Sequence, residues 1–398
     1  MTHEELDLFS DTRTERHRPV RKPRKRKKRR AVLWVSMIVV LGLIGVLGYY
    51  GLTQILDIGS NDDYAGKGES QVVVQVKNGQ STGDIANTLA DADVVASSGA
   101  FIDAAESNDR IRAIQPGYYV VKTKSSAAAA VDQIVAKDAK VGNLQIKAGT
   151  QLQDIKSGDK VTSGIVALLA KASCAELNGK STCVKAADLV ASLKKADVAK
   201  LGVPDWAVPY ASKASPERRL EGLIMPGVYD VKPGSSAEEL WQQLVSNSAT
   251  QLQALGMPNI AQDTGFTPYQ VTVVASLIER EAIEKDFAKV SRVTYNRLAK
   301  RMELQYDSTI NYVLDRPTIR TDVADRNKAG PYNTYKNTGL PPTPISAPSP
   351  EAFKAAAAPA SGKWLYFVRC QKDGTSCFAT TQAQHDKNVA IAQERDAY

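Results

Sequence analysis

VQVKNGQSTGDI, residues 74–85, recurs 70 positions later as LQIKAGTQLQDI, residues 144–155. Both copies alternate apolar and polar residues, reach a Gly, and then begin a helix-like pattern, which predicts a strand, a turn and a helix. PGYYVVKTKSSAAAAVDQIV, residues 116–135, likewise recurs 110 positions later as PGVYDVKPGSSAEELWQQLV, residues 226–245. Each member of this second pair predicts a strand that contains a Tyr, followed by a Ser-capped amphipathic helix. The chain therefore contains one β-rich α+β unit twice, at roughly 72–137 and 142–248.

The second copy contains an insertion of about 40 residues, the difference between the offsets of 110 and 70. The insertion includes a helix-like stretch at 184–201. Two small modules of this kind favour a role in binding and positioning, or a plain duplication of structure. We expect the first module at 71–140 and the second, with its helical insertion, at 141–265, after a polar linker at 53–70.

Four cysteines form two close pairs in the sequence, Cys174 with Cys183 and Cys370 with Cys377. Neither pair has the C-x2-C spacing of a zinc site, so two local disulfides in an oxidising compartment are favoured over four buried thiols. His385 is the only histidine outside the N-terminal tail. The sequence therefore predicts no metal site, no Ser–His–Asp set and no cofactor.

Residues 31–52, AVLWVSMIVVLGLIGVLGYYGL, contain no charged side chain and directly follow RKPRKRKKRR at 21–30. A helix of this length spans about 30 Å, the thickness of the hydrocarbon layer. Because Lys and Arg stay on the cytoplasmic side, we expect a cytoplasmic tail at 1–30 and an extracytoplasmic body. The apolar run is long and no A-x-A site follows it, which favours a retained single-pass anchor in the cell membrane over a cleaved signal peptide.

The positive charge is concentrated in the tail. Residues 1–30 hold twelve of the 51 Lys and Arg residues and five of the 43 Asp and Glu residues, so the remainder is almost neutral. Nucleic-acid binding needs a basic face on a folded domain, and none is predicted. A basic segment next to a membrane span favours contact with anionic lipid instead.

The third region, 266–398, differs in pattern from the two modules. Thr267 followed by Pro268 is typical of a helix N-terminus, and the helix is expected to run to about Lys285. The other elements expected here are a helix at 287–301, a Pro-rich loop at 339–350, a helix at 352–358, a strand at 364–368 and a final helix from about residue 381.

The helix VTVVASLIEREAIEKDF, residues 271–287, holds several acids, and their neighbours distinguish them. Three have a basic residue three or four positions away and are expected to be surface charges: Glu281 with Lys285, Glu284 with Arg280, and Asp286 with Lys289. Glu279 instead faces small and apolar residues, namely Ala275, Ser276, Ala282 and Ile283. Desolvation without a counter-charge raises a carboxyl pKa, as a general acid requires. The alternative is a Glu at a helix interface with a distant Arg partner.

Several long segments resemble one family of cell-wall enzymes. They are ASLIEREA (275–282), VTYNRLAKRMELQYDSTINYVL (293–314), GPYNTYKNTGLPPTPISAPSPEAFKAAAAPA (330–360), WLYFV (364–368), FATTQAQHDKNV (378–389) and LEGLIMPGVYDV (220–231). On these residues the chain resembles the endolytic murein transglycosylase family, also called MltG or YceG-like. Two positions depart from the family pattern: Gly227-Val228 replace Asp-Thr, and Ser376-Cys377 replace Gly-His.

The resemblance implies an α+β fold, with LysM-like modules beside a YceG-like catalytic domain, here 266–398. It implies an endolytic lyase that cleaves the β-1,4 bond between N-acetylmuramic acid and N-acetylglucosamine in nascent peptidoglycan. The product would carry 1,6-anhydro-muramic acid ends, and cleavage would terminate glycan elongation. The family's catalytic glutamate corresponds to Glu279. Peptidoglycan synthases are implied as further partners.

One carboxylate is sufficient for lytic cleavage because the C6 hydroxyl of muramic acid attacks its own C1, and proximity assists that attack. We expect Glu279 to act as acid and then as base, with four polar residues along the sugar groove: Gln305, Asp307, Asn333 and Tyr335. These four have loop stabilisation as their alternative role. Three other functions remain open: a muramidase that uses Asp307 or Glu303 as second carboxylate, a non-enzymatic wall-binding protein, and a scaffold of the synthesis complex.

Overall fold

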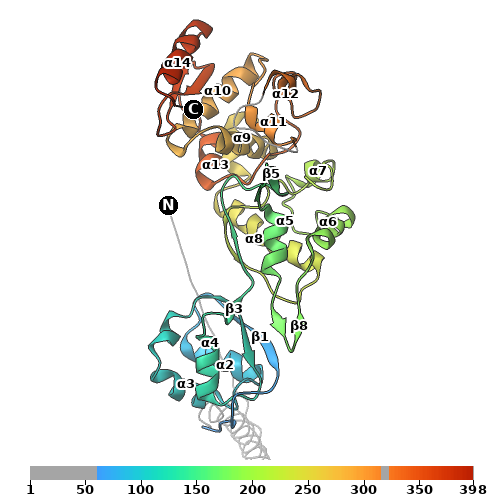
Figure 1. The fold of residues 1–398 in the computed structure, drawn as a ribbon, viewed down its shortest axis with the longest axis vertical. Coiled ribbons are helices and arrows are strands. Elements are labelled where there is room, and N and C mark those ends of the chain that lie inside the picture. Colours follow the sequence, from blue (N-terminus) through green and yellow to red (C-terminus); the bar gives the residue numbers. More distant parts are fainter. Residues whose placement is uncertain (1–60, 315–321, 398) are drawn as a thin grey trace, which may run out of the picture. The chain divides into compact units, whose positions relative to one another are not determined.

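The structure is a computed structural model that describes residues 61–314 and 322–397 (Figure 1). The predicted tail at 1–30, the predicted anchor at 31–52 and residues 53–60 of the predicted linker lie outside this part. Within it, no helix is both long enough and apolar enough to cross a membrane. Helices and strands are mixed along the chain, so the predicted α+β class is confirmed.

The first repeat is a three-stranded antiparallel sheet with order β1-β2-β3, packed against helices. Its elements are β1 (Gln71–Val76), α2 (Thr82–Asp91), α3 (Ser98–Glu106), the 3-10 helix η2 (Asp109–Ala113), β2 (Gly117–Lys122), α4 (Ala127–Ile134) and β3 (Lys140–Val141). Inside the predicted linker, Asp63 accepts a hydrogen bond from the amide of Ala127 at 2.7 Å. Residues just before β1 thus contact the first repeat.

The second repeat contains the predicted insertion. Its elements are β4 (Asn143–Ile146), β5 (Ile155–Ser157), β6 (Lys160–Thr162), α5 (Ile165–Ala172), β7 (Glu176–Leu177), β8 (Lys180–Ser181), α6 (Ala186–Lys195), α7 (Val208–Ala211), β9 (Gly227–Asp230), α8 (Ala237–Ala254) and the 3-10 helix η3 (Asn259–Thr264). The prediction that a helix begins near residue 151 is wrong. The hairpin β5-β6 stands there, and α5 begins only at Ile165.

The two repeats pair their strands in the same register. Val74 lies opposite Tyr119 in the first repeat, and Leu144 lies opposite Tyr229 in the second. These positions differ by the same 70 and 110 residues as the sequence copies. Each Tyr hydroxyl donates to the carbonyl four residues earlier at 2.6 Å. The repeat predicted from sequence is therefore a repeat of structure.

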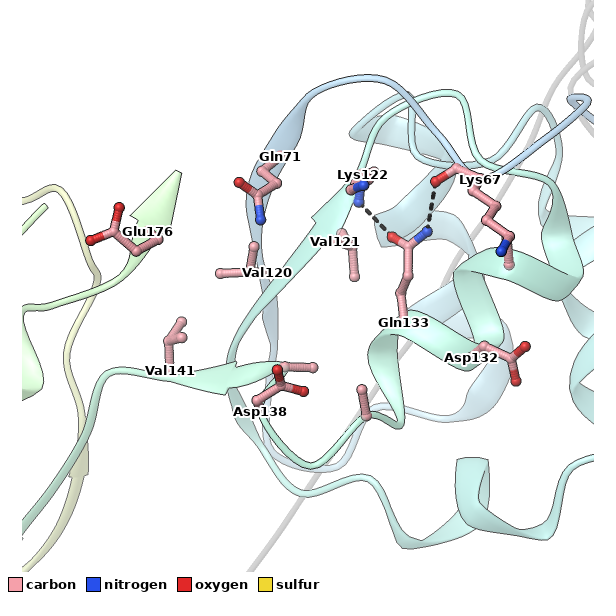
Figure 2. Close-up of a pocket in the computed structure, with 13 residues that line it drawn as sticks. Lys67, Gln71, Val120, Val121, Lys122, Asp132, Gln133, Asp138, Val141 and Glu176 are labelled. Carbon is pink, nitrogen blue, oxygen red and sulfur yellow. Dashed lines mark hydrogen bonds between the residues drawn. The ribbon is translucent and has the colours of Figure 1, made fainter. Parts of the chain in front are cut away.

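A glutamine side chain ties strand to helix in both repeats. Gln133 on α4 accepts a hydrogen bond from the amide of Lys122 at 2.7 Å and donates to the carbonyl of Lys67 at 3.1 Å (Figure 2). Its counterpart Gln243 on α8 accepts from the amide of Lys232 at 3.0 Å. In both copies the side-chain oxygen of an equivalent glutamine accepts from a backbone amide at or just after the end of the strand. The connection from strand to helix is therefore held in the same way in the two repeats.

The third region is mainly helical and ends in a hairpin and a helix. Its elements are α9 (Pro268–Glu281), the 3-10 helix η4 (Glu284–Asp286), α10 (Phe287–Ala299), α11 (Asp307–Asn311), α12 (Val323–Asn327), α13 (Pro350–Ala357), β10 (Tyr366–Arg369), β11 (Ser376–Ala379) and α14 (Gln382–Glu394). Helix α9 begins where predicted, with a capping box between Thr267 and Gln270. It ends at Glu281 and not near Lys285, because Ala282 is extended, with φ −141° and ψ 174°.

The hydrophobic core of the second repeat continues into the third region. Trp241 and Leu144 of the repeat belong to the same buried cluster as Tyr269 and Leu277 of α9. The first repeat has a separate core around Phe101. The boundary predicted near residue 265 therefore does not separate two hydrophobic cores, whereas the one near residue 140 does.

Both cysteine pairs form disulfides within the described residues. Cys174 is bonded to Cys183 in the insertion, and Cys370 to Cys377 across the β10-β11 hairpin. Val368 pairs with Cys377 in that hairpin, so the second disulfide closes the turn between two paired strands.

Candidate active site

Helix α9 carries Glu279 in its last turn. Every residue from Val271 to Ile278 is buried, so this helix passes through the core of the molecule. Glu279 is half-buried and Arg280 is exposed, which marks the point where the helix reaches the surface. A carboxyl held by a buried helix is well positioned, because the helix cannot shift without disrupting the core.

Ser349 holds the Glu279 carboxyl group. The Ser349 amide donates to Glu279 Oε2 at 2.9 Å, and the Ser349 hydroxyl donates to the same oxygen at 2.5 Å. The hydroxyl oxygen also accepts from the amide of Ala352 at 3.2 Å, as the N-cap of α13. A hydroxyl can donate to a carboxylate and accept from a carboxylic acid, so this contact accommodates both protonation states of Glu279.

The Pro-rich loop at 339–350 lies against α9 because it forms two hydrogen bonds with Ser276. The Ser276 hydroxyl accepts from the amide of Ile345 at 3.0 Å, and the Ser346 hydroxyl donates to the Ser276 carbonyl at 3.4 Å. Ser276 lies three residues before Glu279, on the same side of the helix. These two hydrogen bonds position the loop that delivers Ser349 to the carboxyl group.

A turn of the second repeat lies beside Glu279. The amide of Gly149 donates to the carbonyl of Ala347 at 2.8 Å, and the amide of Ala347 donates to the carbonyl of Thr150 at 2.8 Å. Arg280 Nη1 donates to the Gly149 carbonyl at 3.3 Å. A Cβ atom added at Gly149 would lie 4.0 Å from Cγ of Glu279. The candidate site is therefore formed by α9, the loop before α13 and the second repeat together.

Glu281 is not the surface charge that the sequence predicted. Helix α9 ends at this residue, so Lys285 is not one turn beyond it and instead contacts Asp373 at 2.8 Å. The Glu281 side chain is half-buried and accepts from the amide of Ser308 at 3.2 Å. Desolvation raises the pKa of Glu281 to about 7, and the charge of Asp307 adds to this effect.

Asp286 is likewise buried and not a surface charge. Its side chain is 3% exposed, and it accepts a hydrogen bond from the amide of Ser376 at 2.7 Å. Ser376 begins β11, so Asp286 links the start of α10 to the C-terminal hairpin. The prediction failed because a distant strand, and not Lys289 on the same helix, supplies the partner.

Glu221 is a further buried carboxyl that the sequence did not single out. It is 2% exposed, both of its oxygens accept from the amide of Leu152 at 3.1 Å, and Tyr312 donates to it at 3.0 Å. Desolvation raises the pKa of Glu221 to about 7, although these donors and the nearby Arg218 and Arg280 act in the opposite direction. The available signal was its place within the apolar run LEGLIM at 220–225.

Asp307 and Tyr335, two of the four predicted groove residues, contact each other. The Tyr335 hydroxyl donates to Asp307 Oδ1 at 2.7 Å, and Arg326 lies 3.2 Å from Asp307 Oδ2. The Arg326 guanidinium also lies 5.0 Å from the centre of the Tyr335 ring. Burial and the hydrogen bond to Asp307 raise the pKa of the Tyr335 hydroxyl above its usual range. Because Asp307 is next to Ser308, this cluster lies beside Glu281.

Asn333 and Gln305 have structural contacts. Asn333 is 4% exposed, and its amide nitrogen donates to the carbonyls of Arg326 and Lys328 at 2.9 and 2.6 Å. Gln305 is exposed, has a left-handed backbone (φ 57°), and accepts from Arg297 at 3.2 Å. These contacts stabilise the loops that carry both residues, and their place along a sugar groove stays a prediction.

A cavity of about 550 Å³ lies beside β2 and α4 of the first repeat, and Glu176 of the second repeat also lines it (Figure 2). Its polar lining includes Lys122 and Gln133, whose hydrogen bond to each other is already described. Across residues 61–314 and 322–397, no cluster of three or more His, Cys, Asp or Glu side chains could hold a metal ion.

Comparison with known proteins identifies the family to which this chain is similar. The model of the YceG-like family matches residues 74–391. The endolytic murein transglycosylase of Bacillus subtilis is 34% identical over 170 residues, and that of Streptococcus pneumoniae is 32% identical over 190 residues. A crystal structure of a YceG-like protein from Listeria monocytogenes has a TM-score of 0.53 and 28% identity, and the match covers 80% of this chain and 98% of that chain.

The matches to the two transglycosylases are partial. They cover 42% and 43% of this chain, and 46% and 32% of the Bacillus and Streptococcus proteins. The chain thus matches about half or less of the length of these curated relatives. The family match, by contrast, runs from the first strand of the first repeat into α14, and the resemblance predicted from sequence is confirmed. On this match, the chain belongs to the YceG-like family.

Proposed function

We propose that the protein is an endolytic lytic transglycosylase of peptidoglycan, with Glu279 as its acid and base. The observation that carries this proposal is the carboxyl group of Glu279, half-buried at the end of a core helix and held by the Ser349 hydroxyl. The partial similarity to endolytic murein transglycosylases supports the substrate class.

In the proposed reaction, protonated Glu279 donates its proton to the oxygen that leaves C1 of N-acetylmuramic acid, and the C1–O4 glycosidic bond breaks. The resulting carboxylate then accepts the proton of the muramic C6 hydroxyl while O6 bonds to C1. The products are a free N-acetylglucosamine 4-hydroxyl and a 1,6-anhydro end. Glu279 regains its proton and no water is consumed. Ser349 stays bonded to the carboxyl group in both states, which keeps it oriented.

A second carboxylate for hydrolysis finds little support at the predicted positions. Asp307 already contacts the Tyr335 hydroxyl and Arg326. Glu303 is exposed and lies in a backbone bridge with Thr338. A hydrolase that deprotonates water would need a carboxylate free to bind that water.

The decisive experiment is product analysis with the full-length chain purified in detergent. Uncrosslinked glycan strands are digested with wild type, Glu279→Gln and Glu284→Gln, and the products are examined by mass spectrometry. Glu284 is an exposed acid five residues away, so its substitution is the matched control. We expect anhydro ends from wild type and from Glu284→Gln, and at least a thousandfold loss of product with Glu279→Gln.

Three other results would contradict the proposal. Reducing muramic ends in place of anhydro ends would make the enzyme a hydrolase. Equal product from wild type and Glu279→Gln would remove Glu279 as the acid and base, and product from neither would leave a wall-binding or scaffold role for the protein.

We further propose that residues 31–52 anchor the chain in the cell membrane, with residues 1–30 in the cytoplasm. The support is the uncharged apolar run directly after ten residues that include nine Lys and Arg. The test is labelling of intact cells with a membrane-impermeant thiol reagent, using single cysteines placed at Ser10 and at Ser60. Labelling at position 60 alone is expected, and labelling at position 10 would reverse the orientation.

The two repeats are proposed to be LysM-like modules that hold glycan near the catalytic helix. The support is the strand–helix unit shared by both repeats and the turn of the second repeat at Glu279. Peptidoglycan synthases are proposed as partners, because they supply nascent strands. Co-purification of a synthase with the full-length chain tests this partnership.

A further inference from the structure

A second cavity, of about 570 Å³, opens between the second repeat and the third region, and we call it the Arg218 cavity. Its lining includes Lys213, Arg218, Pro331, Tyr332, Pro342 and Thr343. An adjoining cavity of about 630 Å³ shares Val313, Pro331 and Tyr332 with it. Each volume falls in the range of binding sites for small ligands, about 300–1,000 Å³.

Arg218 is the unusual residue of this cavity. Its guanidinium carbon lies 4.6 Å from the centre of the Tyr312 ring and 4.8 Å from that of the Tyr332 ring. Its Nη1 atom is fully buried and has no hydrogen-bond partner among the described residues. A buried donor without an acceptor is unfavourable, so an acceptor from outside the chain would be favoured there.

The nearby acid does not supply that acceptor. Glu221 accepts hydrogen bonds from the amide of Leu152 and from the Tyr312 hydroxyl, and among the described residues no hydrogen bond joins it to Nη1 of Arg218. Arg218 therefore remains a stacked, planar cation on the wall of an open cavity.

The chemistry of the cavity identifies a class of ligand. A guanidinium stacked on aromatic rings has its donor edge left for a planar anion, and carboxylates fit this edge with two parallel hydrogen bonds. Lys213 is exposed at the same cavity and adds a second positive charge. Tyr332 and the two prolines Pro331 and Pro342 offer apolar surface for the carbon skeleton that carries the carboxylate.

We propose that the Arg218 cavity is a substrate subsite that binds a carboxylate of the muramoyl-peptide units of the glycan. This proposal rests on the proposed function for its choice of substrate. The muramoyl unit offers two sources of the same group: the lactyl carboxylate of a bare strand, and the carboxylates of an attached stem peptide. The combined room of the two adjoining cavities favours the stem peptide.

The loop that borders this cavity also reaches the candidate catalytic residue. Thr343 lines the cavity, its hydroxyl is 2.8 Å from the Tyr332 hydroxyl, and Ser349 of the same loop contacts Glu279. One continuous segment thus connects the subsite with the acid/base group. An occupied subsite would keep a strand engaged while the glycosidic bond is presented to Glu279.

The test is calorimetric titration of the full-length chain in detergent with three probes. N-acetylmuramoyl dipeptide carries a peptide carboxylate, N-acetylmuramic acid carries the lactyl carboxylate, and diacetylchitobiose carries none. The variants are Arg218→Gln, Arg218→Lys and Lys213→Gln. Arg112→Gln is the control, because it removes the same charge from an exposed side chain (79%) of the first repeat.

We expect the dipeptide to bind wild type and Arg112→Gln equally and Arg218→Gln at least tenfold more weakly. Arg218→Lys is expected to fall between them, because lysine keeps the charge but not the planar fork. Lys213→Gln is expected to weaken binding about threefold. Because the Lys213 side chain is exposed, a folding defect would not explain this loss of affinity. Binding of N-acetylmuramic acid with the same dependence on Arg218 would also support the subsite and would identify the lactyl group as a source.

Equal affinity of wild type, Arg218→Gln and Lys213→Gln would overturn the proposal, as would binding of diacetylchitobiose as tight as that of the dipeptide. The two proposals fail separately. If wild type and Arg218→Gln bind the dipeptide equally while cleavage still depends on Glu279, only the subsite proposal fails. A Glu279→Gln variant that cleaves normally removes the proposed function, whatever the dipeptide does.

Discussion

At the scale of single residues, a carboxyl group's partners decide what it can do. Glu279 and Glu281 lie two positions apart on α9, and their side chains contact different segments. Glu279 contacts Ser349, whereas Glu281 contacts the amide of Ser308. Residues two apart on a helix point to different sides, so these two acids cannot exchange roles without rebuilding the helix end.

Ser349 is expected to assist Glu279. Ser349→Ala removes the hydroxyl but keeps the hydrogen bond from the backbone N–H of residue 349 to the Glu279 carboxyl group. We expect kcat to fall about tenfold with little change in KM. The substitution also removes an N-cap, at a cost of about 1 kcal/mol. Ser236→Ala removes the N-cap of α8 and is the matched control. A similar loss of kcat in both variants would assign the effect to helix stability.

The buried carboxyl of Glu221 predicts a pH dependence of stability. Its pKa is about 7 in the folded chain and 4.5 in the unfolded chain, so the unfolded chain loses this proton first. Unfolding therefore becomes more favourable as pH rises from about 4.5 to 7, by up to roughly 3 kcal/mol, and then levels off. Below pH 4.5 both states hold the proton and the penalty disappears.

Glu221→Gln removes one titrating group, so its Tm should fall less than that of wild type between pH 5 and pH 8. Thermal unfolding followed by circular dichroism measures both. Glu281 has the same direction of shift, so a smaller dependence should remain in the variant. An unchanged slope in Glu221→Gln would show that this carboxyl group is ionised in the folded protein.

At the scale of elements, the same turn has different surroundings in the two repeats. Gly79 and Gly149 occupy equivalent positions with φ of 79° and 76°. A Cβ at Gly79 would meet nothing within 4 Å, whereas one at Gly149 would lie 3.6 Å from Arg280 Nη1. The repeat thus offers an internal control for the role of the turn beside the candidate site.

Leucine at either glycine has the same backbone strain, about 1–2 kcal/mol, because both require a left-handed conformation. Gly149→Leu also places a bulky side chain beside Glu279 and Arg280. We expect both variants to lower Tm by a similar amount and only Gly149→Leu to lower kcat/KM, by at least tenfold. Equal activity of the two variants would mean that the turn is not part of the site.

At the scale of the whole molecule, the described residues contain more than one hydrophobic core. The first repeat has its own core, whereas the second repeat shares one with α9 and the loop before α13. The second repeat is therefore part of the body that holds the candidate site, and the first repeat has a separate core. The two similar modules therefore have different structural roles.

This division predicts two unfolding transitions in denaturant. Phe101→Ala and Trp241→Ala both remove a fully buried ring, and each should cost about 3–5 kcal/mol. We expect Phe101→Ala to shift one transition and leave cleavage intact. Trp241→Ala should shift the other and reduce cleavage. A single transition that both variants lower would show that the two cores unfold together.

The local signals in the sequence were reliable guides to the elements. The repeat register, the start of α9 at Pro268 and the Ser-capped helices α4 and α8 follow from alternation, turn glycines and capping residues. Each of these signals depends on residues within a few positions of one another. The end of α9 could not be read in this way, since Ala282 leaves the helix without a Gly or Pro.

By itself, the sequence determined the α+β class, the duplicated unit and the resemblance to a family, because backbone periodicity and motif spacing are local properties. Only the tertiary structure decided which acids are buried and what they contact. The partners of Glu279, Arg280 and Glu221 stand 70, 131 and 69 positions away. Burial and hydrogen bonding of a side chain depend on such distant segments, whose approach no local pattern records.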